Sequence, residues 1–134
     1  MIDIHQVAAA HKPILLVVDP KPLLPSLRSF FSKYFEISHC DSVVKALQFL
    51  GSTTPDIVCV STRFTTSKIV LLLEAIKEHS ASRLIPLIFN LDLNEPTIVL
   101  PGTRWAGKLG LATSDMSDVE LEAMCGRLLK VLPN

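Results

Sequence analysis

The sequence predicts a doubly wound α/β domain, in which a five-stranded parallel sheet carries helices on both faces. Short aliphatic runs, such as residues 14–18, are typical of strands that are covered on both sides. Segments with helical spacing of apolar residues lie between these runs. The chain has 134 residues, of which 49% are hydrophobic and 19% charged. This size and composition fit one well-buried domain.

The first half of the predicted domain reads strand, helix, strand. Residues 1–12 show no clear period and are expected to form a leader, so the domain is placed at 13–134. Residues 14–18 are the first strand, and apolar side chains then recur at three and four residues from 23 to 34, which predicts a helix. Residues 35–39 alternate between apolar and polar, as a half-exposed edge strand does.

The middle of the chain repeats this alternation of helix and strand. Asp41 and Ser42 form a start signal for a second helix, which is expected to end near Leu50. Residues 56–60 are the third strand, another aliphatic run. A third helix is expected over residues 67–80, with its first serine as the N-cap.

The last third contains two further strands and the best-marked helix. Residues 85–89 predict a fourth strand, and 108–112 a fifth, which contains a glycine. Between them, residues 91–107 contain prolines and a Pro-Gly pair, so the fourth helix is expected to be irregular or absent. Ser117 and Glu120 have the spacing of a capping box and predict the start of the last helix.

Charge and hydropathy exclude several classes of function. Thirteen basic residues balance thirteen acidic ones without a basic cluster, which argues against direct nucleic-acid binding. The apolar runs are far shorter than the roughly 20 residues of a membrane span, and no signal peptide is recognised, so a cytoplasmic protein is expected. The three cysteines lack CxxC spacing and are expected to be buried free thiols.

Over residues 13–132 the series of elements resembles the receiver domain of bacterial response regulators, which has a flavodoxin-like fold. Residues 13–19, Pro-Ile-Leu-Leu-Val-Val-Asp, resemble the first strand of that family with its terminal acidic pair. Residues 55–60 resemble the strand that delivers the phosphoacceptor, and residues 85–86, Ile-Pro, resemble the opening of the fourth strand. The resemblance implies a role in two-component signal transduction.

The resemblance also implies a phosphorylation pocket, most of whose groups are replaced here. In the family, an acidic pair and an acceptor aspartate hold magnesium, while a hydroxyl and a lysine bind the phosphoryl group. The acidic pair reads Val18-Asp19 and therefore keeps one carboxylate. The remaining positions read Ser61 for the acceptor, Leu91 for the hydroxyl, with Asn90 as its polar neighbour, and Ser114 for the lysine.

These replacements predict a degenerate receiver, or pseudo-receiver. Magnesium is a hard ion that is usually held by one or two carboxylates, so Asp19 alone is expected to bind it weakly or not at all. The Ser61 hydroxyl has no evident base beside it, so phosphotransfer is expected to fail. No GxGxxG, GxxxxGK[ST] or GxSxG motif occurs. We therefore expect no enzyme activity and no cofactor.

The first functional hypothesis is phosphorylation-independent binding of a protein partner or of a second copy of the chain. The expected surface comprises residues 91–107, the fifth strand and the last helix, the face that receivers commonly use. Arg104 and Trp105 are candidate contact residues, since both residue types are enriched at binding hot spots. The tryptophan ring folded back over the sheet edge is an equal alternative.

Two other hypotheses concern the ends of the strands. A small-ligand or anion sensor would use Asp19, Ser61 and Asn90, and a serine/threonine-kinase switch would modify Ser61 or Thr62. Structural roles explain the same residues: Asp19 can accept backbone hydrogen bonds in its turn, and Ser61-Thr62-Arg63 can be an ordinary polar loop instead of an anion site.

Overall fold

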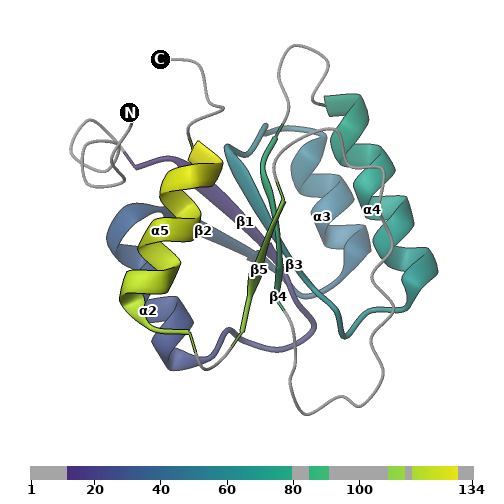
Figure 1. The fold of residues 1–134 in the computed structure, drawn as a ribbon. Coiled ribbons are helices and arrows are strands. Elements are labelled where there is room, and N and C mark those ends of the chain that lie inside the picture. Colours follow the sequence, from purple (N-terminus) through teal and green to yellow (C-terminus); the bar gives the residue numbers. More distant parts are fainter. Residues whose placement is uncertain (1–11, 80–84, 91–108, 114–115, 130–134) are drawn as a thin grey trace.

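The sheet has five parallel strands in the order β2-β1-β3-β4-β5 (Figure 1). The structure is a computed structural model and describes residues 12–79, 85–90, 109–113 and 116–129. Its parallel sheet confirms the predicted α/β fold class. The strands are β1 (Ile14–Val18), β2 (Glu36–Cys40), β3 (Ile57–Ser61), β4 (Leu87–Asn90) and β5 (Leu109–Ala112).

Helices cover both faces of this sheet, as expected. Figure 1 shows α2 and α5 on one face and α3 and α4 on the other. The predicted leader over residues 1–11 and the irregular fourth helix within residues 91–107 lie outside the described residues. The helices are α2 (Pro25–Tyr34), α3 (Val43–Leu50), α4 (Thr66–His79) and α5 (Asp118–Leu129).

The aliphatic runs are explained by two separate cores, one on each face. Successive side chains of a strand point to opposite faces, so Leu15 and Val17 lie in a cluster with α2 and α5, while Leu16 and Val18 lie in a cluster with α3 and α4. Strand β3 divides its side chains in the same way. A strand with two buried faces has no position for a polar residue except at its ends.

Local signals explain where most of the helices begin. Pro25 occupies the first turn of α2, two residues after the predicted start. The Ser42 hydroxyl accepts a hydrogen bond from the Lys45 N–H at 3.1 Å, which confirms the predicted start of α3. The capping box of α5 is also confirmed, because the Ser117 and Glu120 side chains each accept the other residue's N–H at 3.2 Å.

The predicted N-cap of α4 is wrong. Helix α4 begins at Thr66, and the hydroxyl of Thr65 accepts a hydrogen bond from the Lys68 N–H at 3.4 Å. Ser67 lies inside the first turn, and its hydroxyl is 3.3 Å from that of Thr65. Three consecutive hydroxyl residues precede or begin this helix, and the hydrogen-bond geometry selects the first of them, Thr65, as the N-cap.

Packing agrees with two further expectations. Cys40, Cys59 and Cys125 are buried free thiols, as predicted. Strand β2 lies at the edge of the sheet and is partly exposed, which fits its alternating sequence. The helices in the described part of the chain are all too short or too polar to cross a membrane.

Candidate functional site

The candidate site lies at the carboxyl ends of β1, β3 and β4. The chain leaves β1 toward β2 on one side and leaves β3 toward β4 on the other. In open α/β sheets such a reversal leaves a crevice where ligands commonly bind. Asp19 follows β1, Ser61 ends β3, and Asn90 ends β4 in register with Ser61. The sheet therefore brings together three polar residues that the sequence separates widely.

The Asp19 carboxylate is buried, and both of its oxygens contact groups of the same chain. Asp19 is only 1% exposed. Its Oδ1 accepts a hydrogen bond from the Lys21 N–H at 2.9 Å, and its Oδ2 accepts one from Nδ2 of Asn90 at 3.2 Å. Nη1 of Arg63 lies 3.7 Å from Oδ1, at ion-pair distance. The guanidinium supplies the positive charge that a buried carboxylate needs.

The backbone of Asp19 is tied to the edge strand. Its N–H donates to the carbonyl of Cys40 at 3.0 Å, and its carbonyl lies 3.0 Å from Nε2 of His39. These contacts extend the pairing of β1 and β2 by one residue. The carboxylate of Asp19 is thereby held at a defined place beside β3.

The loop after β3 is held in a tight turn that places Arg63. The Ser61 hydroxyl accepts a hydrogen bond from the Arg63 N–H at 3.1 Å, a side-chain bond to the backbone two residues on. The Thr62 N–H and hydroxyl donate to the carbonyl of Asn90 at 3.2 and 3.4 Å. Ser61 is only 2% exposed, so its hydroxyl is a structural group in this turn.

One of the predicted pocket residues is misplaced. Val18 does not line the site, because its side chain is buried in the cluster with α3 and α4. The reason is the strand alternation, which turns consecutive residues to opposite faces. On the other side of Asp19 is Pro20, which is exposed and carries no carboxylate. Asp19 therefore has no acidic neighbour in the chain.

The other predicted residues divide into two groups. Asp19 and Asn90 contact each other directly, and Ser61 and Thr62 lie beside them in the turn after β3. Four candidates lie outside the described residues: Leu91, Arg104, Trp105 and Ser114.

Sequence reasoning missed the role of Arg63. The sequence indicates only a candidate anion site or an ordinary polar loop at residues 61–63, whereas the structure pairs Arg63 with Asp19. The available signal was a basic residue two positions after the end of a strand, next to a site with a single carboxylate. Among the described residues no three His, Cys, Asp or Glu side chains gather as a metal site would need.

The solved structures similar to this chain include receiver domains. The chain matches the N-terminal domain of a response regulator/sensory box/GGDEF protein from Carboxydothermus hydrogenoformans with TM-score 0.69 and 17% identity, covering 87% of this chain and 94% of that one. It matches the receiver domain of a signal transduction histidine kinase from Syntrophus aciditrophicus with TM-score 0.69 and 22% identity, covering 91% and 93%. At these identities the likeness establishes the fold.

A further match is a receiver domain with a bound metal ion. The receiver domain of a sensor histidine kinase from Pseudomonas aeruginosa, with magnesium coordinated in its active-site cleft, matches with TM-score 0.62 and 17% identity, covering 89% of this chain and 98% of that one. No family model matches the chain, and no curated protein matches it.

Proposed function

We propose that this chain is a cytoplasmic signal-transduction module with a receiver fold that acts by binding a protein, without phosphorylation. One observation carries the proposal. The buried Asp19 carboxylate is compensated by Arg63 and Asn90 of its own chain, beside a buried serine at the acceptor position. The likeness to receiver structures supports a signalling role.

The donor set around Asp19 does not fit magnesium. Magnesium demands octahedral oxygen ligands and is usually held by one or two carboxylates with waters and substrate phosphates. Asp19 is a single carboxylate, and both of its oxygens already have partners. A cation approaching it would also meet the positive charge of Arg63. We therefore expect Asp19 and its neighbours to hold no magnesium ion.

Ser61 is poorly suited to accept a phosphoryl group. A serine hydroxyl needs a base to become a nucleophile, and the neighbours of Ser61 Oγ include an N–H donor from Arg63. Its burial also hides it from a serine/threonine kinase. Phosphate on Ser61 or Thr62 would add about two negative charges near the buried carboxylate of Asp19. The kinase-switch alternative is therefore disfavoured.

A ligand sensor at the strand ends is also disfavoured. The side chains expected to bind a ligand, those of Asp19, Ser61 and Asn90, are engaged with their own chain. Within the described residues, no buried side-chain nitrogen or oxygen lacks a hydrogen-bond partner. A ligand would have to break these contacts before making its own.

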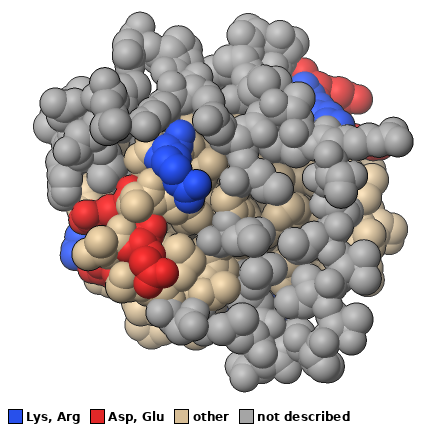
Figure 2. All heavy atoms as spheres, in the orientation of Figure 1, with Lys and Arg blue, Asp and Glu red and all other residues tan. Residues whose placement is uncertain are grey.

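A surface that binds a partner protein is the remaining candidate for the functional site. On the face shown in Figure 2, the basic side chains of the described residues lie in small groups, some of them beside acidic side chains, and form no broad basic surface. This distribution agrees with a partner other than nucleic acid. We place the interface on residues 91–107, β5 and α5, where Arg104 and Trp105 would be central contacts. Val119 of α5, which is 75% exposed, would lie within it.

Titration with magnesium and then with beryllofluoride, a mimic of aspartyl phosphate, tests phosphorylation independence. Backbone NMR signals of Asp19, Ser61 and Asn90 and the melting temperature are followed up to millimolar concentrations. We expect no saturable change. The triple variant Pro20→Asp/Ser61→Asp/Arg63→Met, which adds two carboxylates and removes the guanidinium, is the positive control and should respond. A saturable response of the wild type would contradict the proposal.

The interface is tested separately. Sedimentation shows whether the chain self-associates, and cross-linking in cells identifies a different partner. Trp105→Ala and Val119→Glu are expected to weaken whichever association is found, while the melting temperature stays within a few degrees of the wild type. If neither variant changes the association, the interface lies elsewhere.

A further inference from the structure

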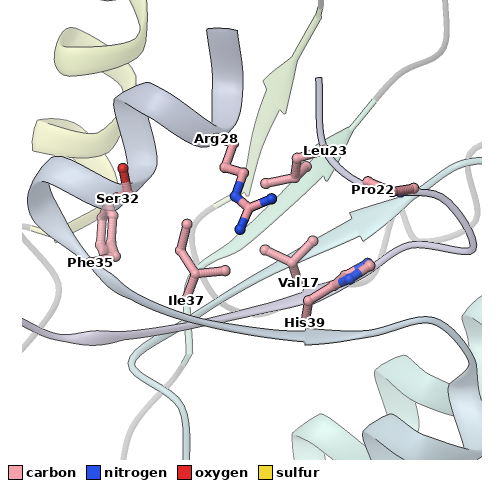
Figure 3. Close-up of a pocket in the computed structure, with 8 residues that line it drawn as sticks. All are labelled: Val17, Pro22, Leu23, Arg28, Ser32, Phe35, Ile37 and His39. Carbon is pink, nitrogen blue, oxygen red and sulfur yellow. The ribbon is translucent and has the colours of Figure 1, made fainter. Parts of the chain in front are cut away.

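A cavity lies between α2 and the edge of the sheet, and the Asp19 carboxylate is not part of its lining. It has a volume of about 270 Å³ and is lined by residues of α2, β1 and β2 and of the segment between β1 and α2 (Figure 3). We call it the α2/β2 pocket. β2 is the last strand on this side of the sheet, so the pocket lies at the sheet edge.

The pocket has an apolar floor and a basic rim. Val17 and Phe35 are buried, and Ile37 is half-buried. Arg28 and His39 are exposed and lie at the opening. Figure 3 shows the Arg28 guanidinium extending from α2 over the floor, on the same side of the sheet as Ile37 and Val17. The arrangement presents a cation above apolar side chains.

This cation lacks an internal counter-ion in the described structure. Arg28 makes no ion pair among the described residues, whereas Lys33 on the same helix pairs with Asp118 at 3.8 Å. The described residues that line the pocket include no acidic side chain. A guanidinium over an apolar surface is complementary to a ligand that combines an anionic head with an apolar body.

We propose that the α2/β2 pocket binds a small carboxylate with an apolar body, such as an aromatic acid. Its carboxylate would pair with the Arg28 guanidinium, whose planar fork matches two carboxylate oxygens. Its ring would lie on Val17 and Ile37. An apolar cavity of about 150 Å³ can hold benzene. The 270 Å³ of this pocket therefore leaves room for a ring and a carboxylate.

The pocket adjoins the candidate site through one side chain. His39 lines the pocket, and its Nε2 lies 3.0 Å from the backbone carbonyl of Asp19. A ligand that contacts His39 would therefore also shift the backbone signal at the end of β1. The ligand site itself uses other residues and does not depend on the proposed function.

The test measures binding of benzoate and phenylacetate, with benzamide and benzyl alcohol as neutral analogues of similar shape. Backbone NMR titrations of the full chain are run in a buffer free of other carboxylates. We expect the acids to bind with a Kd on the order of 1 mM and to shift the signals of Ile37, His39 and the residues around Arg28. The neutral analogues should bind at least about ten-fold more weakly.

Two variants separate the specific contact from general charge. Arg28→Gln should weaken binding of the acids by about ten-fold or more, because it removes a charge-assisted hydrogen bond. Lys33→Gln removes the same charge from the same helix, outside the pocket, and should leave binding unchanged. Both residues are exposed, so both variants should fold, and the melting temperature checks this.

Several results would overturn the proposal. One is equal binding of acids by the wild type and the Arg28→Gln variant, and another is equal binding of acids and neutral analogues. Shifts confined to other parts of the chain, or none with either acid at millimolar concentrations, would overturn it as well. The wild-type shift map depends on no substitution and remains decisive if a variant fails to fold.

Discussion

The ion pair between Asp19 and Arg63 should contribute measurably to stability, although its two charged groups are 3.7 Å apart. At that separation two unit charges interact by about 4.5 kcal/mol if the effective dielectric constant is near 20. Water reduces this value, because the Arg63 side chain is 24% exposed. The Asn90 amide and the Lys21 N–H also continue to stabilise the carboxylate when the arginine is removed. We therefore expect a coupling energy of about 1–2 kcal/mol.

A double-mutant cycle measures this coupling. The free energy of unfolding in urea is determined for the wild type, Asp19→Asn, Arg63→Met and the double variant. The cycle is needed because each single variant also changes other contacts: Arg63→Met removes a further contact of Arg63, and Asp19→Asn alters the bonds from Lys21 and Asn90. A matched control is the same cycle for Asp41 and Lys45, a closer pair at 2.9 Å whose two side chains are more than half exposed.

Comparing the two cycles shows whether burial or a short distance between the charged groups contributes more to the coupling energy. If burial of Asp19 governs the interaction, the longer Asp19–Arg63 pair should couple more strongly than the shorter surface pair. A coupling indistinguishable from zero, or smaller than that of Asp41 and Lys45, would refute the view that Arg63 is the internal counter-ion of the site.

Four other predictions concern packing and chemistry. Gly126→Ala should raise the free energy of unfolding by about 0.5–1 kcal/mol, because the added methyl in α5 meets no atom within 4 Å. Gly110→Ala should lower it by about 1 kcal/mol or more, because its methyl would lie 2.9 Å from a methionine sulfur of α5. Ser117→Ala should cost about 1 kcal/mol through loss of the capping box, and urea unfolding measures all three variants. In the native state, iodoacetamide should alkylate Cys40 before Cys125. Cys40 is 8% exposed, whereas Cys125 is fully buried and desolvation raises its thiol pKa to about 12. Mass spectrometry gives the order of alkylation.

The elements that the sequence predicted best are those whose signal is local. Residues 14–18 match β1 because a strand buried on both faces must be apolar throughout. The starts of α3 and α5 match because Ser42 and Ser117 form their capping bonds within three residues. Other boundaries shift by a residue or two, and Ser61 ends β3 instead of following it, because pairing with β4 continues to Asn90.

The candidate site was less predictable because its contacts join distant parts of the chain. Nothing close to Asp19 in the sequence indicates that residues 63 and 90 would engage its carboxylate; only the strand order brings their side chains together. The α2/β2 pocket was missed for the same reason. Arg28 belongs to a helix and His39 to a strand, and only the way α2 lies against the sheet edge makes them neighbours.

The pairing of Asp19 with Arg63 has a consequence for how such a module would be controlled. A magnesium ion exchanges with solvent, so a site that needs one responds to the metal concentration and to chelators. The Arg63 guanidinium is covalently part of the chain, and its effective concentration at the carboxylate is set by a short connection. Neither dilution nor a chelator removes it. A module built in this way keeps one state at this site, and its output would vary with the abundance and availability of its partner.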